Sequence, residues 1–184
     1  MKKLNVGIVG CGMITKERHI PAYKRMKDKV NLKAVCDLDE DLAKETAKEN
    51  NIPKAYKDSS EMYEKENLDI VDICVPPHVH APVAIEAIEN GAHIIMEKPM
   101  ATTVKDCNKM LEAAEEHDVE ICTIHNVRYH PAFIEAKEKV ENGEIGEFLG
   151  MRILLSTPKH HMMDMKDHWY HDLPGGVLGE TGPH

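Results

Sequence analysis

Glycines near the N-terminus are spaced so that they could bring a phosphate against bare backbone. In the segment NVGIVGCGMIT, residues 5–15, a short apolar run passes through Gly10 and Gly12 into a stretch expected to be helical. Glycine tolerates a sharp strand-to-helix turn and lacks the Cβ that would keep a pyrophosphate from the backbone N–H groups. We therefore expect Gly10, Gly12, Met13 and Ile14 to contact a dinucleotide at the positive end of that helix.

The alternative interpretation is a glycine turn that closes a strand without a ligand. The fingerprint G-x-G-x-x-G is only partly met, because Thr15 stands where a third small residue is usual. The turn alone is therefore a weak signal for a cofactor site.

An acid after the next apolar run strengthens the dinucleotide hypothesis. The run 30–36 leads to Asp37, at the distance from the glycines that the fingerprint expects. Its carboxylate could accept both hydroxyls of the adenosine ribose and would repel a 2′-phosphate, and no Arg follows it nearby. NAD is thus favoured over NADP. The alternative for Asp37 is an N-cap of the following helix, a role that Asp39 would serve better and that would leave Asp37 free.

Composition limits the classes of partner. The 184 residues carry a net charge of −9, from 23 basic and 32 acidic residues, which argues against a nucleic acid or an anionic membrane as the main partner. No segment approaches the length of a membrane span, and we expect a cytoplasmic protein. The five cysteines lack CxxC spacing and sit mostly in apolar runs, so we expect reduced core residues, Cys122 among them, rather than disulfides.

Strands and helices alternate over the first two thirds of the chain. The expected strands lie at residues 6–9, 32–36, 55–56, 69–75, 93–96 and 119–123. The expected helices lie at residues 13–27, with a second segment from Pro21, and at 40–50, 60–66, 82–90 and 104–117. This alternation predicts an α/β fold, a Rossmann doubly wound parallel sheet over residues 1–124, with ligands at the carboxyl ends of its strands.

Residues 125–184 have a different character. A helix is expected at Pro131–Asn142, ended by Gly143, and a long strand at Phe148–Ser156. A helix and a strand added to a finished Rossmann unit cannot bury a core of their own. We therefore expect residues 125–184 to be the incomplete beginning of an α+β substrate domain, and the chain to be a fragment of a larger protein.

Several longer motifs can be compared with known families. Besides the glycine turn and Asp37, they are V-P-P-x-x-H at Val75–His80, G-x-x-I-I-x-E-K-P at Gly91–Pro99, R-Y-H-P at Arg128–Pro131, N-G-x-I-G at Asn142–Gly146 and G-G-x-L-x-E-x-G-x-H at Gly175–His184. Together they resemble the glucose–fructose oxidoreductase / inositol dehydrogenase / MocA (Gfo/Idh/MocA) family of NAD(P)-dependent oxidoreductases. The E-K-P element and the final motif are the most specific.

The resemblance implies hydride transfer between a nicotinamide and a secondary alcohol of a sugar, sugar derivative or cyclitol. His184 would take the hydroxyl proton, and Lys98 would hydrogen-bond the reacting oxygen and stabilise its developing charge. Glu180 could orient His184 or bridge to Lys98. Taken singly, a loop lysine and a histidine at the end of the chain are more often ordinary surface residues, and only their place in two motifs favours the catalytic interpretation.

The resemblance also implies the binding contacts. Glu97 would contact the nicotinamide ribose, and Pro76, Pro77 and His80 would run beside the cofactor. The candidates for contact with the sugar are Arg128, Tyr129, Trp169, Tyr170 and His171. The family's second domain, a large mostly antiparallel sheet, covers the active site and often mediates oligomerisation, so we expect a homo-oligomer of the full-length protein.

Two positions depart from the family pattern. Pro77 stands where the family usually has Asn, and Glu180 stands where it usually has Asp. The carboxylate of Glu180 lies one methylene further out, which leaves its role open.

Three alternatives remain. A metal site among His160, His161, Asp164, Asp167, His168 and His171 is disfavoured by their uneven spacing, and we expect no metal. An NAD-dependent glycosidase-like enzyme would oxidise a sugar only transiently. A non-catalytic NAD or sugar sensor tends to lose the catalytic Lys or His, and both Lys98 and His184 are present here.

Overall fold

The computed structural model describes residues 2–153. Their arrangement divides the chain into two units, Met1–Ile124 and His125–His184, and each is described by itself below. None of the helices in the described part of the chain is long and apolar enough to cross a membrane.

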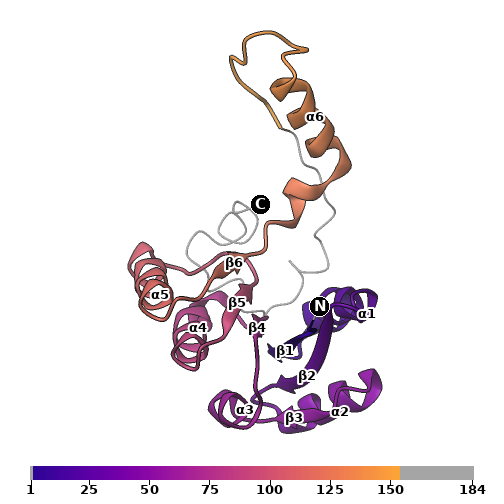
Figure 1. Cartoon of the computed structure of the whole chain (residues 1–184), viewed down its shortest axis with the longest axis vertical. Coiled ribbons are helices and arrows are strands. Elements are labelled where there is room, and N and C mark those ends of the chain that lie inside the picture. Colours follow the sequence, from indigo (N-terminus) through magenta and orange to yellow (C-terminus); the bar gives the residue numbers. More distant parts are fainter. Residues whose placement is uncertain (1, 154–184) are drawn as a thin grey trace, which may run out of the picture. The chain divides into compact units, whose positions relative to one another are not determined.

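The first unit is built on six parallel strands in the order β3-β2-β1-β4-β5-β6 (Figure 1). Their bounds are β1 Leu4–Val9, β2 Val30–Cys36, β3 Lys54–Tyr56, β4 Ile70–Ile73, β5 His93–Met96 and β6 Ile121–Thr123. The strand order reverses at β1, which lies between β2 and β4. The predicted doubly wound Rossmann sheet is thereby confirmed, and its crevice for a ligand lies at the carboxyl ends of β1 and β4.

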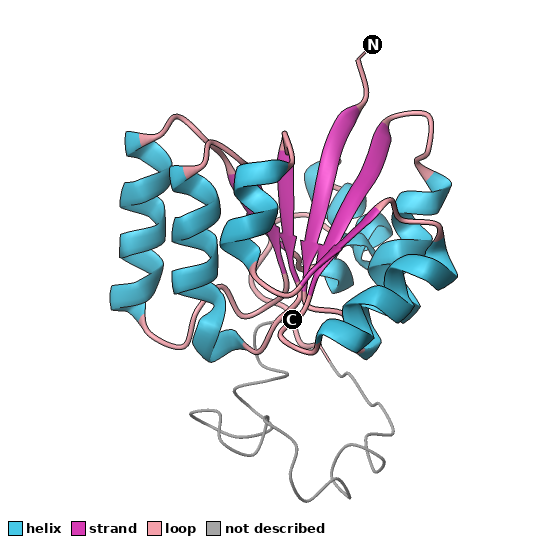
Figure 2. Ribbon diagram, turned by 90° about the horizontal axis from the view of Figure 1, so that it is seen from below, coloured by secondary structure: helices cyan, strands magenta, loops and turns pink. Residues whose placement is uncertain are grey.

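Helices cover both faces of this sheet (Figure 2). Their bounds are α1 Ile20–Arg25, α2 Glu40–Asn50, α3 Ser59–Lys65, α4 His80–Glu89 and α5 Val104–Glu116. One core cluster takes its helical side chains from α1 and α2, and the other takes them from α3, α4 and α5. Side chains of one strand alternate between the two faces, as in β4, where Val71 and Ile73 join the second cluster and Asp72 faces α1.

The first helix departs from the sequence prediction. Helical backbone begins at Met13, but Thr15–His19 form a π-helical segment, η1, before α1 begins at Ile20. The backbone N–H of Ile20 donates to the oxygen of Thr15, five residues back. Pro21 has no N–H to donate, so the break before it was predictable, whereas the wider π turn was not.

The second unit contains the short helix η3, Asn126–Tyr129, and α6, Pro131–Glu141. Gly143 follows α6 with φ +71°, as expected of a residue that ends a helix. The prediction of a strand at Phe148–Ser156 is wrong over 148–153, the part that the structure describes, where no strand forms. A strand needs a partner for its backbone groups, and these six residues pair with no described strand.

One cysteine also differs from expectation. Cys36 and Cys74 are buried and reduced, as predicted, but Cys122 is exposed. It lies on β6, which is an edge strand of the sheet.

Candidate functional site

The glycine turn lies at the carboxyl end of β1 and needs glycine at one position for a specific reason. Gly10 has φ +99°, and a Cβ there would lie 2.5 Å from the backbone oxygen of Cys74. At Gly12 a Cβ would meet no atom of the described residues within 4 Å, so these residues leave the space above it open. Gly10 is therefore required by the fold, while Gly12 leaves room for a group bound from outside.

The helix that follows presents its first turn to this open space. Its first intrahelical bond runs from the N–H of Lys16 to the oxygen of Gly12, and the N–H groups before Lys16 have no acceptor one turn back. Gly12, Met13 and Ile14 are exposed. Exposed N–H groups in the first turn of a helix, beside an open glycine, are the donors that commonly hydrogen-bond a pyrophosphate.

Thr15 explains the incomplete fingerprint. Its side chain is buried, and Oγ1 donates to the oxygen of Gly10 over 2.7 Å. The buried hydroxyl of Thr15 thus provides a hydrogen-bond donor for the carbonyl of Gly10. Position 15 therefore accommodates a residue larger than glycine.

Asp37 follows β2, the neighbour of β1, and is tied to the glycine turn. Its Oδ2 accepts the N–H of Cys11 over 2.7 Å, and its Oδ1 accepts the N–H of Asp39 over 2.9 Å. Asp39 caps α2, as predicted, by accepting the N–H groups of Asp41 and Leu42. Asp37 is thus not the cap, but it is not free either, because these two bonds hold its carboxylate at the cofactor crevice with lone pairs left for further donors.

Three residues expected beside the cofactor follow β4. Pro76 is half-buried and Pro77 buried, and His80 has no exposed surface. The Nε2 of His80 lies 2.8 Å from the oxygen of Val75, and its Nδ1 lies 2.9 Å from that of Pro99. The ring of His80 is enclosed and joins the loop after β4 to the loop after β5, and its contact with the cofactor stays a prediction.

Glu97 and Lys98 follow β5 at the same edge of the sheet, and both are half-buried. The Oε2 of Glu97 accepts the backbone N–H of Lys98 over 3.2 Å, and its Oε1 lies 3.1 Å from the Nε2 of His19. Burial raises the pKa of Glu97, but the hydrogen bond and charge of His19, with the N–H and charge of Lys98, more than offset it and hold the pKa below its usual value. Glu97 therefore stays ionised at neutral pH.

Sequence reasoning missed a buried polar cluster behind these residues. The Nδ1 of His19 lies 2.7 Å from the Oδ2 of Asp72, which also accepts the Tyr23 hydroxyl over 2.9 Å. The Cys74 Sγ lies 3.3 Å from the same ring nitrogen. An aspartate inside the otherwise apolar run I-V-D-I-C-V was the signal that could have revealed this cluster.

His19, Asp72 and Cys74 are also types of residue that bind metals. Tetrahedral zinc bonds of about 2.0–2.1 Å would place ligand atoms roughly 3.3 Å apart. The 2.7 Å between His19 and Asp72 is instead a hydrogen-bond distance. We therefore assign this cluster as a hydrogen-bonded network.

The remaining predicted site residues lie either in the second unit or outside the described residues. Arg128 and Tyr129 belong to the second unit, where the guanidinium carbon lies 5.7 Å from the ring centre of the exposed tyrosine. Trp169, Tyr170, His171, Glu180 and His184 lie outside the described residues, as do His160, His161, Asp164, Asp167 and His168.

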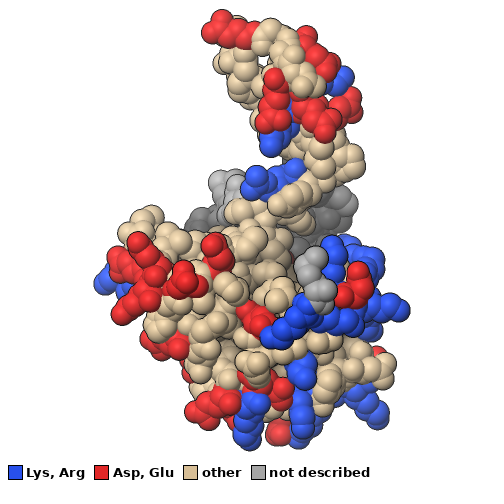
Figure 3. Space-filling view, viewed as in Figure 1, with Lys and Arg blue, Asp and Glu red and all other residues tan. Residues whose placement is uncertain are grey.

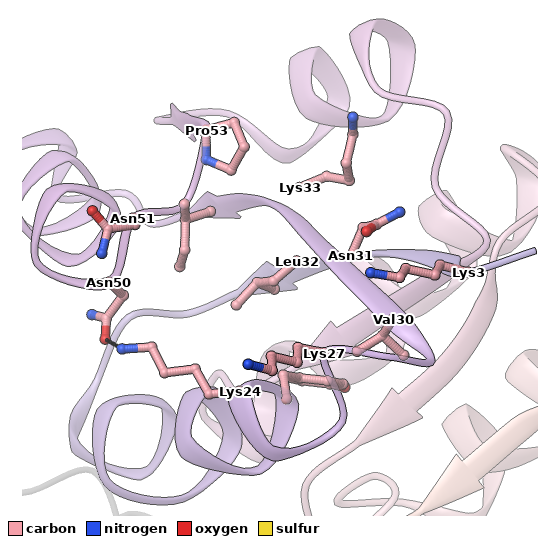
Figure 4. A pocket seen from close by; sticks show the side chains of 12 residues that line it. Lys3, Lys24, Lys27, Val30, Asn31, Leu32, Lys33, Asn50, Asn51 and Pro53 are labelled. Carbon is pink, nitrogen blue, oxygen red and sulfur yellow. Dashed lines mark hydrogen bonds between the residues drawn. The ribbon is translucent and has the colours of Figure 1, made fainter.

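A pocket of about 550 Å³ lies at the other end of the sheet, before β1, β2 and β3 begin. Its lining includes the four lysines Lys3, Lys24, Lys27 and Lys33 (Figure 4). Blue side chains gather on this side of the first unit, near α1, while red ones predominate near α5 (Figure 3). Lys24 donates to the Oδ1 of Asn50 over 2.8 Å. None of the predicted site residues lines this pocket.

The comparisons with known proteins agree with the geometry of the crevice. Residues 4–125 match the model of a family described as an oxidoreductase family with an NAD-binding Rossmann fold. The chain is 31% identical over 175 residues to a myo-inositol 2-dehydrogenase of Thermotoga maritima, covering 95% of this chain and 50% of that protein. It is 33% identical over 159 residues to a levoglucosan dehydrogenase of Pseudarthrobacter phenanthrenivorans, covering 83% and 40%.

Solved structures give the same result. An NAD-binding oxidoreductase from Klebsiella pneumoniae superposes with a TM-score of 0.86 at 30% identity, over 97% of this chain and 50% of that one. A levoglucosan dehydrogenase in complex with NADH and levoglucosan gives a TM-score of 0.74 at 32% identity, over 79% and 41%. The chain thus spans about half the length of the relatives it matches.

Proposed function

The chain belongs to the Gfo/Idh/MocA oxidoreductase family with an NAD-binding Rossmann fold. From this premise we propose that it is part of an NAD-dependent dehydrogenase that acts on sugars or cyclitols. The reaction would transfer a hydride between the nicotinamide and a secondary alcohol. Two relatives named for myo-inositol and for levoglucosan support this class of substrate.

The observation that carries the proposal is the pairing of the open glycine turn with Asp37. The space above Gly12 is open, and the Asp37 carboxylate is held at the same turn by the N–H of Cys11. The turn would hold the pyrophosphate, and Asp37 would accept the hydroxyls of the adenosine ribose. The same carboxylate would repel a 2′-phosphate, which favours NAD over NADP.

At the other end of the crevice the chain supplies polar groups for the reacting half. Glu97, held ionised, would accept a hydroxyl of the nicotinamide ribose. Lys98 would donate to the substrate oxygen as its negative charge develops. His184 would take or return the proton of the alcohol, and Glu180 would orient it. The bound nicotinamide supplies the hydride acceptor or donor.

The test is a substrate screen of the native protein with NAD. We expect NADH to accumulate with a free cyclitol or anhydrosugar such as myo-inositol or levoglucosan, followed by absorbance, and the keto product to be detected by mass spectrometry. Cleavage of a glycoside without net NADH would favour the glycosidase-like alternative. NADH binding with no turnover across sugars, anhydrosugars and cyclitols would contradict the dehydrogenase and favour a sensor.

A further inference from the structure

A single imidazole connects three elements that surround the cofactor crevice. His19 is the last residue of η1. It lies on the helix whose first turn faces the open space above Gly12. Asp72 lies in the middle of β4, and Glu97 directly follows β5. The ring of His19 reaches both carboxylates, at 2.7 Å from Nδ1 and 3.1 Å from Nε2. One side chain therefore links the phosphate end of the crevice to its nicotinamide end.

The geometry defines the charge of this ring. A neutral imidazole has one N–H, so only the doubly protonated form can donate to two ionised carboxylates at once. Burial lowers the pKa of His19, but its hydrogen bonds to Asp72, Cys74 and Glu97 raise it to about 12. The arrangement is thus a carboxylate–imidazolium–carboxylate chain.

The groups around this chain agree with that protonation state. From α1, the Tyr23 hydroxyl donates to Asp72. After β4, the Cys74 thiol contacts both His19 and Asp72, and burial raises its pKa to about 12, so it stays neutral. After β5, the backbone N–H of Lys98 donates to Glu97. Each carboxylate is therefore met by donors, and His19 is the member that both share.

Stability alone does not account for such a network. A buried ion pair can be replaced by apolar side chains of similar volume at little or no loss of stability. The backbone also adopts a π-helical segment that ends at His19, and π segments are rare and found often at functional sites. The π turn changes the direction in which His19 leaves the helix relative to a regular α turn, and here it leads to Asp72.

We propose that His19 is a positioning residue of the cofactor site, which fixes the Glu97 carboxylate and the turn into Lys98 in the orientation needed by the nicotinamide half. This inference rests on the proposed function. Asp72 orients the ring from behind, and Glu97 is the member that faces the crevice. Loss of the charged ring would leave the buried Asp72 and the half-buried Glu97 without a shared donor, and the pKa of Glu97 would rise.

The first test needs no substitution and no cofactor. Nitrogen-15 NMR of the protein at pH about 8 would show both ring nitrogens of His19 protonated, whereas an ordinary histidine, with a pKa of about 6.5, is neutral there. A neutral His19 ring at that pH would overturn the inference.

The second test measures NADH affinity by nicotinamide fluorescence from pH about 6 to pH about 9. The unsubstituted protein should show a nearly constant affinity, because Glu97 stays ionised. His19→Gln should bind NADH roughly tenfold more weakly at the acid end, the loss of one charged hydrogen bond, and should recover as pH rises. Glu97→Gln should be weak at every pH, and the double variant no weaker than Glu97→Gln alone.

Tyr23→Phe is the matched control. It removes another donor to the same oxygen of Asp72 but leaves the bond to Glu97 in place. We expect lower stability and unchanged NADH affinity. Additive losses in the double variant, or an equal loss of affinity in Tyr23→Phe, would show a merely structural role. Failure of the unsubstituted protein to bind NADH would overturn the proposed function, whereas NADH binding with a neutral ring overturns the inference alone.

Discussion

The Nδ1 of His19 lies 2.7 Å from the Oδ2 of Asp72, a carboxylate with no exposed surface. Burying a charged pair costs desolvation energy, which is offset only when the two partners are well hydrogen-bonded to each other. Removing one partner leaves the other charge buried and unpaired. Since the pKa of His19 is raised in the fold, this ring makes the stability of the fold depend on pH.

The stability should fall with pH on the alkaline side. The pKa of His19 is raised to about 12 in the fold, so its contribution is complete below its unfolded pKa of about 6.5 and is lost as pH rises through about 12. The slope is at most about 1.4 kcal/mol per pH unit in this window. Urea unfolding at several pH values would measure it, and His19→Gln should reduce the slope. Equal slopes in both proteins would contradict the assignment.

Glu97 acts on the acid side. Its pKa lies below its usual value of 4.5 in the fold, so its contribution to stability is present above that value and is lost as pH falls through the folded pKa. Glu97→Gln should therefore lose less stability than the unsubstituted protein when the pH is lowered below about 4.5, in the same urea titration. A steeper acid loss in the variant would contradict this account.

Removing one member of the buried pair should cost more than removing a neighbour. Asp72→Ala would leave the imidazolium of His19 without its buried partner, at a cost of about 3–5 kcal/mol. Tyr23→Phe removes one hydrogen bond to the same carboxylate, about 1.5–3 kcal/mol. Urea unfolding at neutral pH should rank the two variants in this order, and the reverse order would show that the ion pair is not the main interaction.

Replacing each of the two glycines of the turn by alanine should affect a different property: the stability at Gly10 and the NADH affinity at Gly12. Gly10→Ala combines a positive φ with a Cβ 2.5 Å from the oxygen of Cys74, so we expect a loss of stability of at least about 1–3 kcal/mol. Gly12→Ala adds a methyl group to open space and should unfold at the same urea concentration, yet bind NADH more weakly. Unchanged NADH affinity in Gly12→Ala would show that the phosphates bind elsewhere.

Most of the fold followed from the sequence because apolar periodicity and glycine turns report directly on buried strands and helix ends. Asp37 and Asp39 could be told apart from their distance to the next helix. The π segment could not be predicted, because it ends at His19, whose partners lie on β4 and directly after β5. The burial of His80 could not be predicted either, because a motif gives the position of a residue along the chain, while its burial depends on carbonyls of two separate loops.

Lys98 should affect turnover more than cofactor binding. If it donates to the reacting oxygen, Lys98→Met should lower kcat by about 10²–10³-fold and leave NADH affinity nearly unchanged. Lys105→Met, which removes an exposed lysine of α5, is the matched control and should leave both parameters unaltered. A loss of NADH affinity in Lys98→Met with unchanged kcat would place Lys98 in cofactor binding instead.

The central claim is that Asp37 and the glycine turn form an NAD site, and parallel fluorescence titrations with NADH and NADPH test it most directly. We predict NADH to bind at least about tenfold more tightly than NADPH. Asp37→Ala should abolish the preference, and Asp39→Ala, which removes the same charge from the cap of α2, should retain it. Equal binding of both nucleotides by the folded, unsubstituted protein, or no binding of either, would contradict the account.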